Sequence, residues 1–106
     1  MQTKNKDNHI KFSKYETIYI LNPEEKEIYL ISLEMINRYQ NFLRNKGAKN
    51  IFTQNRGRRH LTYSIKKYND GIFLQLAYEG NGGLIQSIER NMKFNEKIIR
   101  YLTIRQ

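Results

Sequence analysis

The sequence predicts an α+β domain with the element order β-α-β-β-α-β. Apolar side chains recur at helical spacing in two segments, residues 28–43 and 84–92. β-Branched and aromatic residues, which are typical of strands, dominate four other segments, residues 14–21, 48–67, 72–79 and 97–105. Because β-α-β crossovers are right-handed, both helices are expected on one face of a four-stranded antiparallel sheet.

The first strand is predicted to lead into a helix with a defined start and end. Residues 14–21 carry few charges, so this strand is expected at the centre of the sheet. Asn22 is expected to cap the helix, with Pro23 at its first position and Glu25 completing a capping box. Gly47 supplies the left-handed residue that ends it. The stripe packed on the sheet consists of Ile28, Ile31, Met35, Tyr39, Phe42 and Leu43.

Residues 56–71 are predicted to form the basic half of a β-hairpin. Leu61, Tyr63 and Ile65 share one parity and form the dry face of the strand. The wet face consists of Arg58, His60, Thr62, Ser64 and Lys66. A bulge is expected at Gly57, where the alternation breaks.

The turn of this hairpin is predicted at Asp70-Gly71, because both residue types tolerate positive φ. A two-residue loop there sets apolar residues opposite each other, whereas a three-residue loop moves every partner to the wrong face. The resulting register pairs Asn69 with Ile72, Lys67 with Leu74, Ile65 with Leu76 and Tyr63 with Tyr78.

The last three elements complete a ferredoxin-like arrangement. The third strand is expected to place alternate residues on the core face, namely Ile72, Leu74, Leu76 and Tyr78. A short helix follows, with helical spacing of Leu84, Ile85, Ile88 and Met92. The last strand bears Ile98, Ile99, Leu102 and Ile104. The tyrosines interpreted as core residues are Tyr15, Tyr19, Tyr63 and Tyr78.

Composition points to a polyanionic partner. The chain has 106 residues, which fits one domain, and it carries a net charge of +9. Residues 1–13 are expected to form a flexible basic arm and residues 14–106 the domain. There is no cysteine and so no disulfide or thiolate metal site, and no apolar run is long enough to span a membrane. Ile, Asn and Lys make up 37 of the 106 residues, which favours an AT-rich genome such as that of an organelle.

Three stretches carry a resemblance to a known family. GRRHLTYSI, ERNMKFNEKIIRYLTIR and YETIYILNPE resemble the bacterial-type small-ribosomal-subunit protein six over residues 15–105. The resemblance implies a ribosomal structural protein that binds the central domain of the small-subunit rRNA and pairs with the eighteenth small-subunit protein. It implies no catalysis and no cofactor. The family usually has Pro where Ser64 stands, so this strand gains a backbone donor.

The candidate rRNA contacts are basic residues of the hairpin, with a second set near the C-terminal helix. The hairpin set consists of Arg56, Arg58, Arg59, His60, Lys66 and Lys67. The second set includes Arg90 and Lys93 and ranks lower, because helix ends collect cations for dipole reasons. A solvated edge strand protected from aggregation is the alternative interpretation of the hairpin. Neighbouring Arg58 and Arg59 are expected to point to opposite faces.

Other functions fit the sequence less well. The third strand lacks the aromatic signature of an RNA-recognition motif, so Phe73 is expected to meet a protein partner instead. Neither histidine has a local catalytic partner, and an acylphosphatase-like enzyme would need a phosphate loop where Glu24 and Glu25 stand. A free-standing module that self-associates through its open sheet face is the main alternative. Neither a membrane nor a small-molecule substrate is expected as a partner, and the expected location is the ribosome of a chloroplast stroma or a bacterial cytoplasm.

Overall fold

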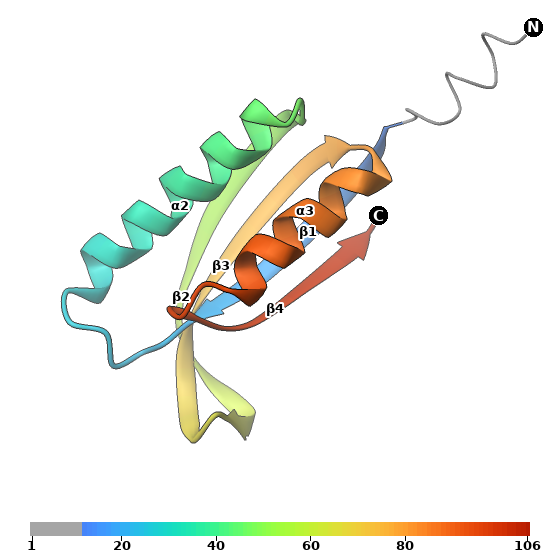
Figure 1. Cartoon of the computed structure of the whole chain (residues 1–106). Helices are drawn as coiled ribbons and strands as arrows, with labels where there is room; N and C mark the ends of the chain where they lie inside the picture. The colour runs from blue at the N-terminus through green and yellow to red at the C-terminus, as the bar shows by residue number, and fades with distance from the viewer. Residues whose placement is uncertain (1–11) are drawn as a thin grey trace, which may run out of the picture.

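The computed structural model describes residues 12–106 and contains the predicted order of elements (Figure 1). The expected arm, residues 1–13, lies almost entirely outside the described residues. The elements are β1 (Ser13–Leu21), α2 (Ile28–Asn45), β2 (Lys49–Ile65), β3 (Tyr68–Gly80), α3 (Gly82–Lys93) and β4 (Ile98–Arg105).

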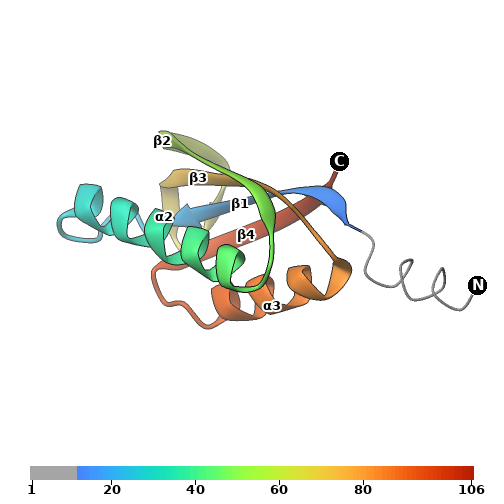
Figure 2. The same ribbon diagram turned by 90° about the horizontal axis from the view of Figure 1, so that it is seen from above.

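The four strands form one antiparallel sheet in the order β2-β3-β1-β4, so β1 is central as predicted. Both helices lie side by side on the same face of this sheet, and the other face is left open (Figure 2). This is the ferredoxin-like arrangement that the sequence predicts.

The core lies between the helices and the sheet. From α2 it takes Met35, Tyr39 and Leu43, which are fully buried and belong to the predicted stripe. The buried residues of α3 are Leu84, Ile88 and Met92, and those of β3 are Ile72, Leu74, Leu76 and Tyr78. Each fully buried Leu or Met side chain contributes roughly 1.5–3 kcal/mol through removal of apolar surface from water, which fixes the helices on this face.

The end of α2 is as predicted, but its start is not. Gly47 has φ 90°, and the N–H of Ala48 donates to the carbonyl of Leu43 at 2.9 Å, which closes the helix. At the other end, the side chain of Asn22 accepts a hydrogen bond from the backbone N–H of Glu24 at 2.9 Å. Asn22 therefore stabilises a turn instead of capping a helix, and α2 begins five residues later than expected, after Glu27.

The hairpin turn also differs from the prediction. Ile65 pairs with Tyr68, so the loop is Lys66-Lys67, and both lysines have positive φ, 51° and 74°. Asp70 lies within β3 and pairs with His60. The predicted bulge at Gly57 is confirmed, since the register shifts between Asn55 and Gly57 and Gly57 has φ 82°.

Packing on the open face explains why Gly71 is not in the turn. A Cβ at Gly71 would lie 2.4 Å from Cγ2 of Ile20 and 3.3 Å from the carbonyl oxygen of Leu21. The glycine is needed where β3 leaves its pairing with β1, because the side chain of Ile20 fills the space beside it. A second register shift lies between His60 and Ile65, and it brings Leu61 into a small buried cluster with Ile20 and Ile99. These contacts outweigh the local turn preference of Asp-Gly.

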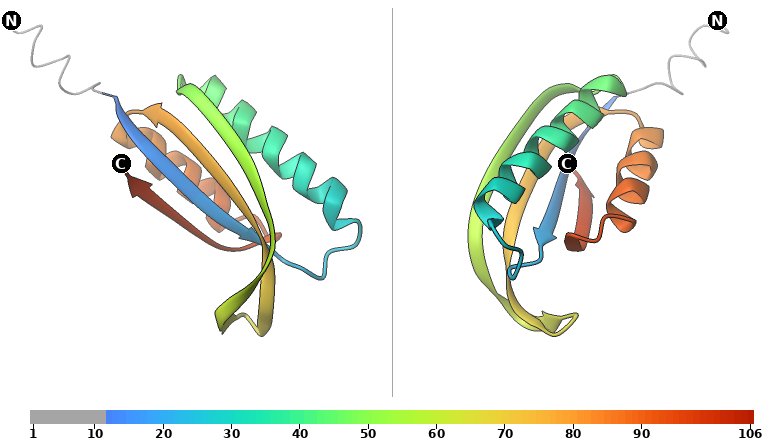
Figure 3. Two further views of the ribbon diagram at one scale, coloured as in Figure 1. Left: turned by 180° about the vertical axis from the view of Figure 1, so that it is seen from behind. Right: turned by 60° about the vertical axis from the view of Figure 1, so that its left-hand side comes forward.

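The distal part of the hairpin extends beyond the rest of the sheet. The pairing of β3 with β1 ends at Ile72, so residues 59–71 form a two-stranded ribbon, called the ribbon below. Figure 3 shows it projecting past the ends of β1 and β4 and away from the helices. Its turn is therefore presented at one tip of the molecule.

Candidate nucleic-acid interface

The turn of the ribbon presents two lysines to solvent. Lys66 and Lys67 are exposed and follow one another at the tip, where the positive φ of both residues reverses the chain. Neither forms an ion pair within residues 12–106. Two adjacent ammonium groups at a projecting tip suit contact with phosphate, because a Lys acts as a mobile point charge.

Two arginines of β2 lie on the open face of the sheet. Arg59 is opposite Gly71, and its guanidinium carbon is 5.9 Å from the ring centroid of Phe73. Nε of Arg56 donates to Oε1 of Gln75 at 2.8 Å, and the amide nitrogen of Gln75 donates in turn to the carboxylate of Glu16. Both arginines are exposed and form no ion pair in the described part of the chain, so most of their donors remain available.

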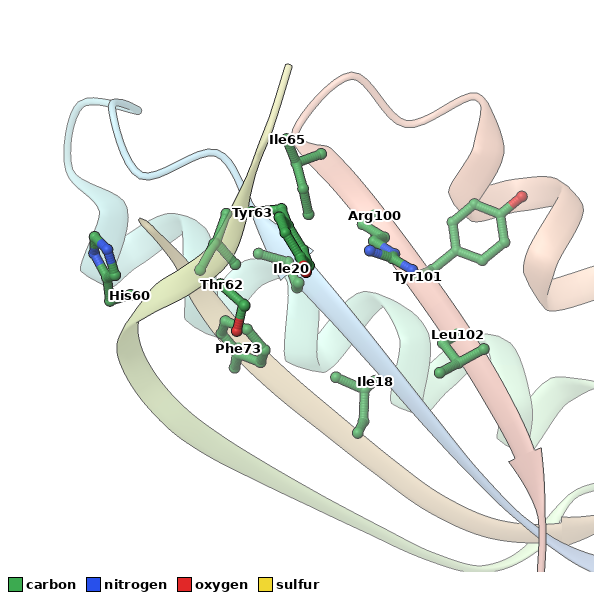
Figure 4. A pocket seen from close by; sticks show the side chains of 11 residues that line it. Ile18, Ile20, His60, Thr62, Tyr63, Ile65, Phe73, Arg100, Tyr101 and Leu102 are labelled. Carbon is green, nitrogen blue, oxygen red and sulfur yellow. The ribbon is translucent and has the colours of Figure 1, made fainter. Parts of the chain in front are cut away.

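Arg58 points to the other face, as the strand alternation predicts. Its Nη1 donates to Oδ2 of Asp70 at 2.8 Å, and its Nη2 donates to the carbonyl of Pro23 at 3.1 Å. This guanidinium thus links the ribbon to the loop after β1. His60 follows on the same face opposite Asp70, and its ring points away from Ile18 and Ile20 (Figure 4).

The two candidates on α3 are separate from the hairpin set. Arg90 and Lys93 are exposed in the last turn of α3, on the helix layer, whereas the ribbon belongs to the sheet. Nζ of Lys93 lies 5.9 Å from the ring centroid of Phe94, which is 73% exposed. The structure therefore divides the predicted basic residues between two surfaces.

The open face of the sheet contains an apolar hollow of about 330 Å³. Figure 4 shows Ile20, Phe73 and Leu102 lining it from β1, β3 and β4, with Arg100 at its side. Large apolar side chains remain exposed on this face, namely Phe52 (60%), Leu102 (53%) and Ile104 (46%). An exposed apolar surface of this kind is typical of a protein contact.

The prediction that Tyr63 is a core residue is wrong. Its side chain is 83% exposed at the rim of the hollow, because the turn at Lys66-Lys67 places Tyr63 near the tip of the ribbon and the expected pairing with Tyr78 does not form. Tyr19 and Tyr78 are buried as predicted, and Tyr15 is half-buried beside Tyr78. Burial raises the pKa of both Tyr19 and Tyr78 above the ordinary value of 10.0.

The structure brings together surface residues of α2 that the pattern of basic residues in the sequence does not group. Arg38 and Lys46 on α2 face α3, and their spacing of eight residues, with Phe42 midway, places them on one row of the helix. That spacing is visible in the sequence, but the apolar pattern of the helix places Phe42 in the core stripe.

Among residues 12–106, no group of three or more potential metal ligands lies together. No helix in the same range is both long and apolar enough to cross a membrane.

Comparison with known proteins identifies the family. The family model described as ribosomal protein S6 matches residues 14–105. The "small ribosomal subunit protein bS6c" of Porphyra purpurea is 52% identical over 106 residues, covering 100% of this chain and 92% of that protein. The bS6 protein of a Cyanothece strain is 42% identical over 92 residues, covering 87% of this chain and 85% of that protein.

A solved structure agrees with the sequence comparisons. The crystal structure of 30S ribosomal protein S6 from Thermotoga maritima superimposes with a TM-score of 0.79 at 26% identity, covering 91% of this chain and 89% of that one. The match extends over both helices and all four strands, because the family model spans them from Lys14 to Arg105. The chain therefore belongs to the ribosomal protein S6 family and is a non-enzymatic, structural protein of the small ribosomal subunit.

Proposed function

We propose that this protein binds the central domain of the small-subunit rRNA through the basic side chains of its hairpin, jointly with the eighteenth small-subunit protein. The observation that carries the proposal is a set of exposed hairpin cations that form no ion pair among residues 12–106, namely Arg56 at the base of the ribbon and Arg59, Lys66 and Lys67 on it. Because each phosphate contact releases condensed counterions, such a cluster favours a polyanion of fixed shape. His60 extends from the face of β2 opposite to Arg59, and Arg90 and Lys93 offer a second contact on α3.

The geometry of the ribbon supports recognition by shape and charge. Arg59 and the lysine tip are separated along a two-stranded ribbon, so they can reach successive phosphates of a folded RNA. Arg58 holds this ribbon against the loop after β1 through Asp70 and Pro23. In this proposal Arg58 is a positioning residue, whereas the other cations contact RNA.

The open face of the sheet is the proposed surface for the partner protein. Its apolar hollow and the exposed Phe52, Leu102 and Ile104 fit a partner that supplies aliphatic or aromatic side chains. Arg59 stacks on Phe73 at the edge of this face, so the protein contact and the RNA contact adjoin. Joint binding then follows, because the partner orders the face from which the arginine projects.

The proposed location is a plastid ribosome, with a bacterial ribosome as the second possibility. The chain is 52% identical to a plastid-type relative and 42% identical to a cyanobacterial one. The abundance of Ile, Asn and Lys fits an AT-rich organelle genome. Sequencing of the source genome around the coding region decides between the two.

The experiment is a binding titration of the full chain against a central-domain rRNA fragment, with and without the eighteenth protein. We expect the partner to increase affinity at least ten-fold and a steep loss of affinity as salt rises. Affinity that is indifferent to both salt and partner would overturn the proposal. A stable dimer of this chain alone, absent from the small-subunit fraction, would instead support a self-associating module.

Two neighbouring arginines give the sharpest test of the roles within the hairpin. Arg59→Gln removes an exposed cation and is expected to weaken rRNA binding by about 1 kcal/mol, or five-fold. Loss of its contact with Phe73 is expected to lower stability by roughly 0.5–1 kcal/mol. Arg58→Gln breaks an exposed ion pair, so we expect a loss of roughly 0.5–1 kcal/mol of stability and a smaller effect on binding. Thermal melts and salt-dependent titrations measure both. The assignment fails if Arg58→Gln weakens binding more than Arg59→Gln does.

A further inference from the structure

A groove on the helix layer combines positive charge with exposed aromatic rings. It is lined by residues of α2 and α3, which cover the face of the sheet opposite the hollow (Figure 2), and it has a volume of about 430 Å³. Six of the residues that line it are charged, aromatic or amide residues: Arg38 and Phe42 from α2, its C-terminal cap Lys46, Arg90 and Asn91 from α3, and its C-terminal cap Phe94. The hairpin contributes nothing to this surface.

The two helices present these side chains in matching rows. Arg38, Phe42 and Lys46 are four residues apart on α2, and Arg90 and Phe94 are four apart at the end of α3, so each row faces the groove. A polar network fixes the floor between the rows. The hydroxyl of Tyr39 donates to Oδ1 of Asn91 and accepts from the side-chain nitrogen of Asn95, each at 3.0 Å.

The three cations of the groove have no ion-pair partner in the part of the chain that the structure describes. Arg38, Lys46 and Arg90 are exposed, and none forms an ion pair within the described 12–106 range. Glu34, four residues before Arg38 on α2, instead approaches Nζ of Lys97 at 3.8 Å. Three cations along one groove therefore favour an extended anion.

The aromatic rings favour a nucleotide chain over an acidic peptide as the anion that binds the groove. Phe94 is 73% exposed, although it adjoins the groove, and Nζ of Lys46 lies 5.7 Å from the ring centroid of Phe42. An acidic peptide would neutralise the cations but would leave the face of Phe94 in water. A nucleotide chain supplies both parts, because its phosphates meet the cations and its bases stack on aromatic faces. Stacking requires unpaired bases, so the strand must be single.

We infer that the groove between α2 and α3 binds a segment of single-stranded RNA, with Arg38, Lys46 and Arg90 contacting phosphates and Phe94 stacking against a base. The inference rests on the proposed function only in that RNA is the ligand. Its residues lie on the helix layer, so the protein would hold a folded rRNA on one side and an unpaired strand on the other.

The test is fluorescence anisotropy of the full chain with a labelled ten-nucleotide oligouridine and with a ten-base-pair RNA duplex, over a range of salt. Arg38→Gln with Arg90→Gln removes two phosphate contacts and is expected to lower the salt slope for the single strand by roughly 1.4, at about 0.7 per contact. Phe94→Ala is expected to weaken single-strand binding at least five-fold while leaving the slope and the duplex affinity unchanged. Because Phe94 is exposed, this variant keeps its fold, which a thermal melt verifies.

The matched control is Lys26→Gln with Arg44→Gln, which removes the same charge from exposed positions outside the groove. An equal fall in slope for this control would overturn the inference, since net charge would then explain binding. Unchanged single-strand affinity in Phe94→Ala would overturn it as well. So would displacement of the labelled oligouridine by polyglutamate as effectively as by unlabelled oligouridine. Lys66→Gln with Lys67→Gln should leave the Phe94 effect unchanged. If the chain does not bind the central-domain rRNA fragment even when the eighteenth protein is present, the proposed function is rejected. The effect of Phe94→Ala on single-strand binding would still support the groove.

Discussion

The hairpin of β2 and β3 runs through two parts of the molecule that are held by different interactions. One is the four-stranded part of the sheet, called the body, and the other is the two-stranded ribbon. In the body, β3 alternates between fully buried residues such as Leu74 and Leu76 and half-buried residues on the open face. In the ribbon, most side chains are exposed, and the contacts that fix it are the Arg58–Asp70 pair and the burial of Leu61. Burial by the helices dictates register in the body, whereas a few specific contacts dictate it in the ribbon.

The largest expected effect on stability comes from comparing Leu74 in the body with Tyr63 in the ribbon. The alternation of apolar residues in the sequence predicts that both lie in the core. Leu74→Ala creates a cavity at a side chain with no exposure, so we expect a loss of about 2–5 kcal/mol in the free energy of unfolding. Tyr63→Ala, at a side chain that is 83% exposed, is expected to change it by less than ~0.5 kcal/mol. Urea titrations measure both. Similar losses for the two variants would mean that the ribbon packs like the body.

This contrast also explains what could be predicted from the sequence. The element order, the stripe on α2 and the core face of β3 were predictable, because each follows a period set by burial between two layers. The turn was not, because Asp-Gly is a strong local signal for a turn, and the contacts that override it are long-range. Leu61 meets Ile20 and Ile99, and Arg58 meets Asp70, none of which has a periodic signature.

The candidate site was predictable in composition more than in arrangement. The alternation of β2 correctly separated Arg58 from Arg59, but it could not indicate that Asp70 and Pro23 would take up the guanidinium of Arg58. Likewise, Asn22 and Pro23 have the composition of a helix start, and Asn22 instead closes a turn onto Glu24. Short polar side chains satisfy several local geometries, so tertiary contacts select among them.

The next effect concerns the place where body and ribbon meet. Gly71→Ala introduces a Cβ that would lie 2.4 Å from a methyl of Ile20, which is itself buried, so we expect a loss of about 1–3 kcal/mol. Gly82→Ala is the matched control, because nothing lies within 4 Å of its Cβ, and it should be neutral or slightly stabilising. Thermal melts compare the two. A neutral Gly71→Ala would show that the ribbon shifts freely over β1.

The smallest expected effects on stability concern the body alone and come from its buried tyrosines. Burial raises the pKa of Tyr19, Tyr39 and Tyr78 above 10.0 in the folded chain, so above that pH the unfolded chain has released protons that the folded chain retains. Stability is therefore fully present below pH 10 and falls as pH rises, by up to about 1.4 kcal/mol per pH unit for each tyrosine. Tyr19→Phe and Tyr78→Phe should each make this alkaline loss shallower.

At neutral pH the same two substitutions should have opposite signs. The hydroxyl of Tyr19 is buried without a hydrogen-bond partner among the residues described, so Tyr19→Phe is expected to raise the free energy of unfolding by about 1 kcal/mol. The hydroxyl of Tyr78 bonds Thr17 Oγ1 at 2.7 Å, so Tyr78→Phe is expected to lower it by about 1 kcal/mol. Urea titrations at pH 7 and above pH 10 measure both variants. If Tyr19→Phe destabilises the protein at pH 7, the Tyr19 hydroxyl has a hydrogen-bond partner. The buried polar groups of the body would then all be hydrogen-bonded, and local strain would be confined to the ribbon, where Lys66 and Lys67 have positive φ.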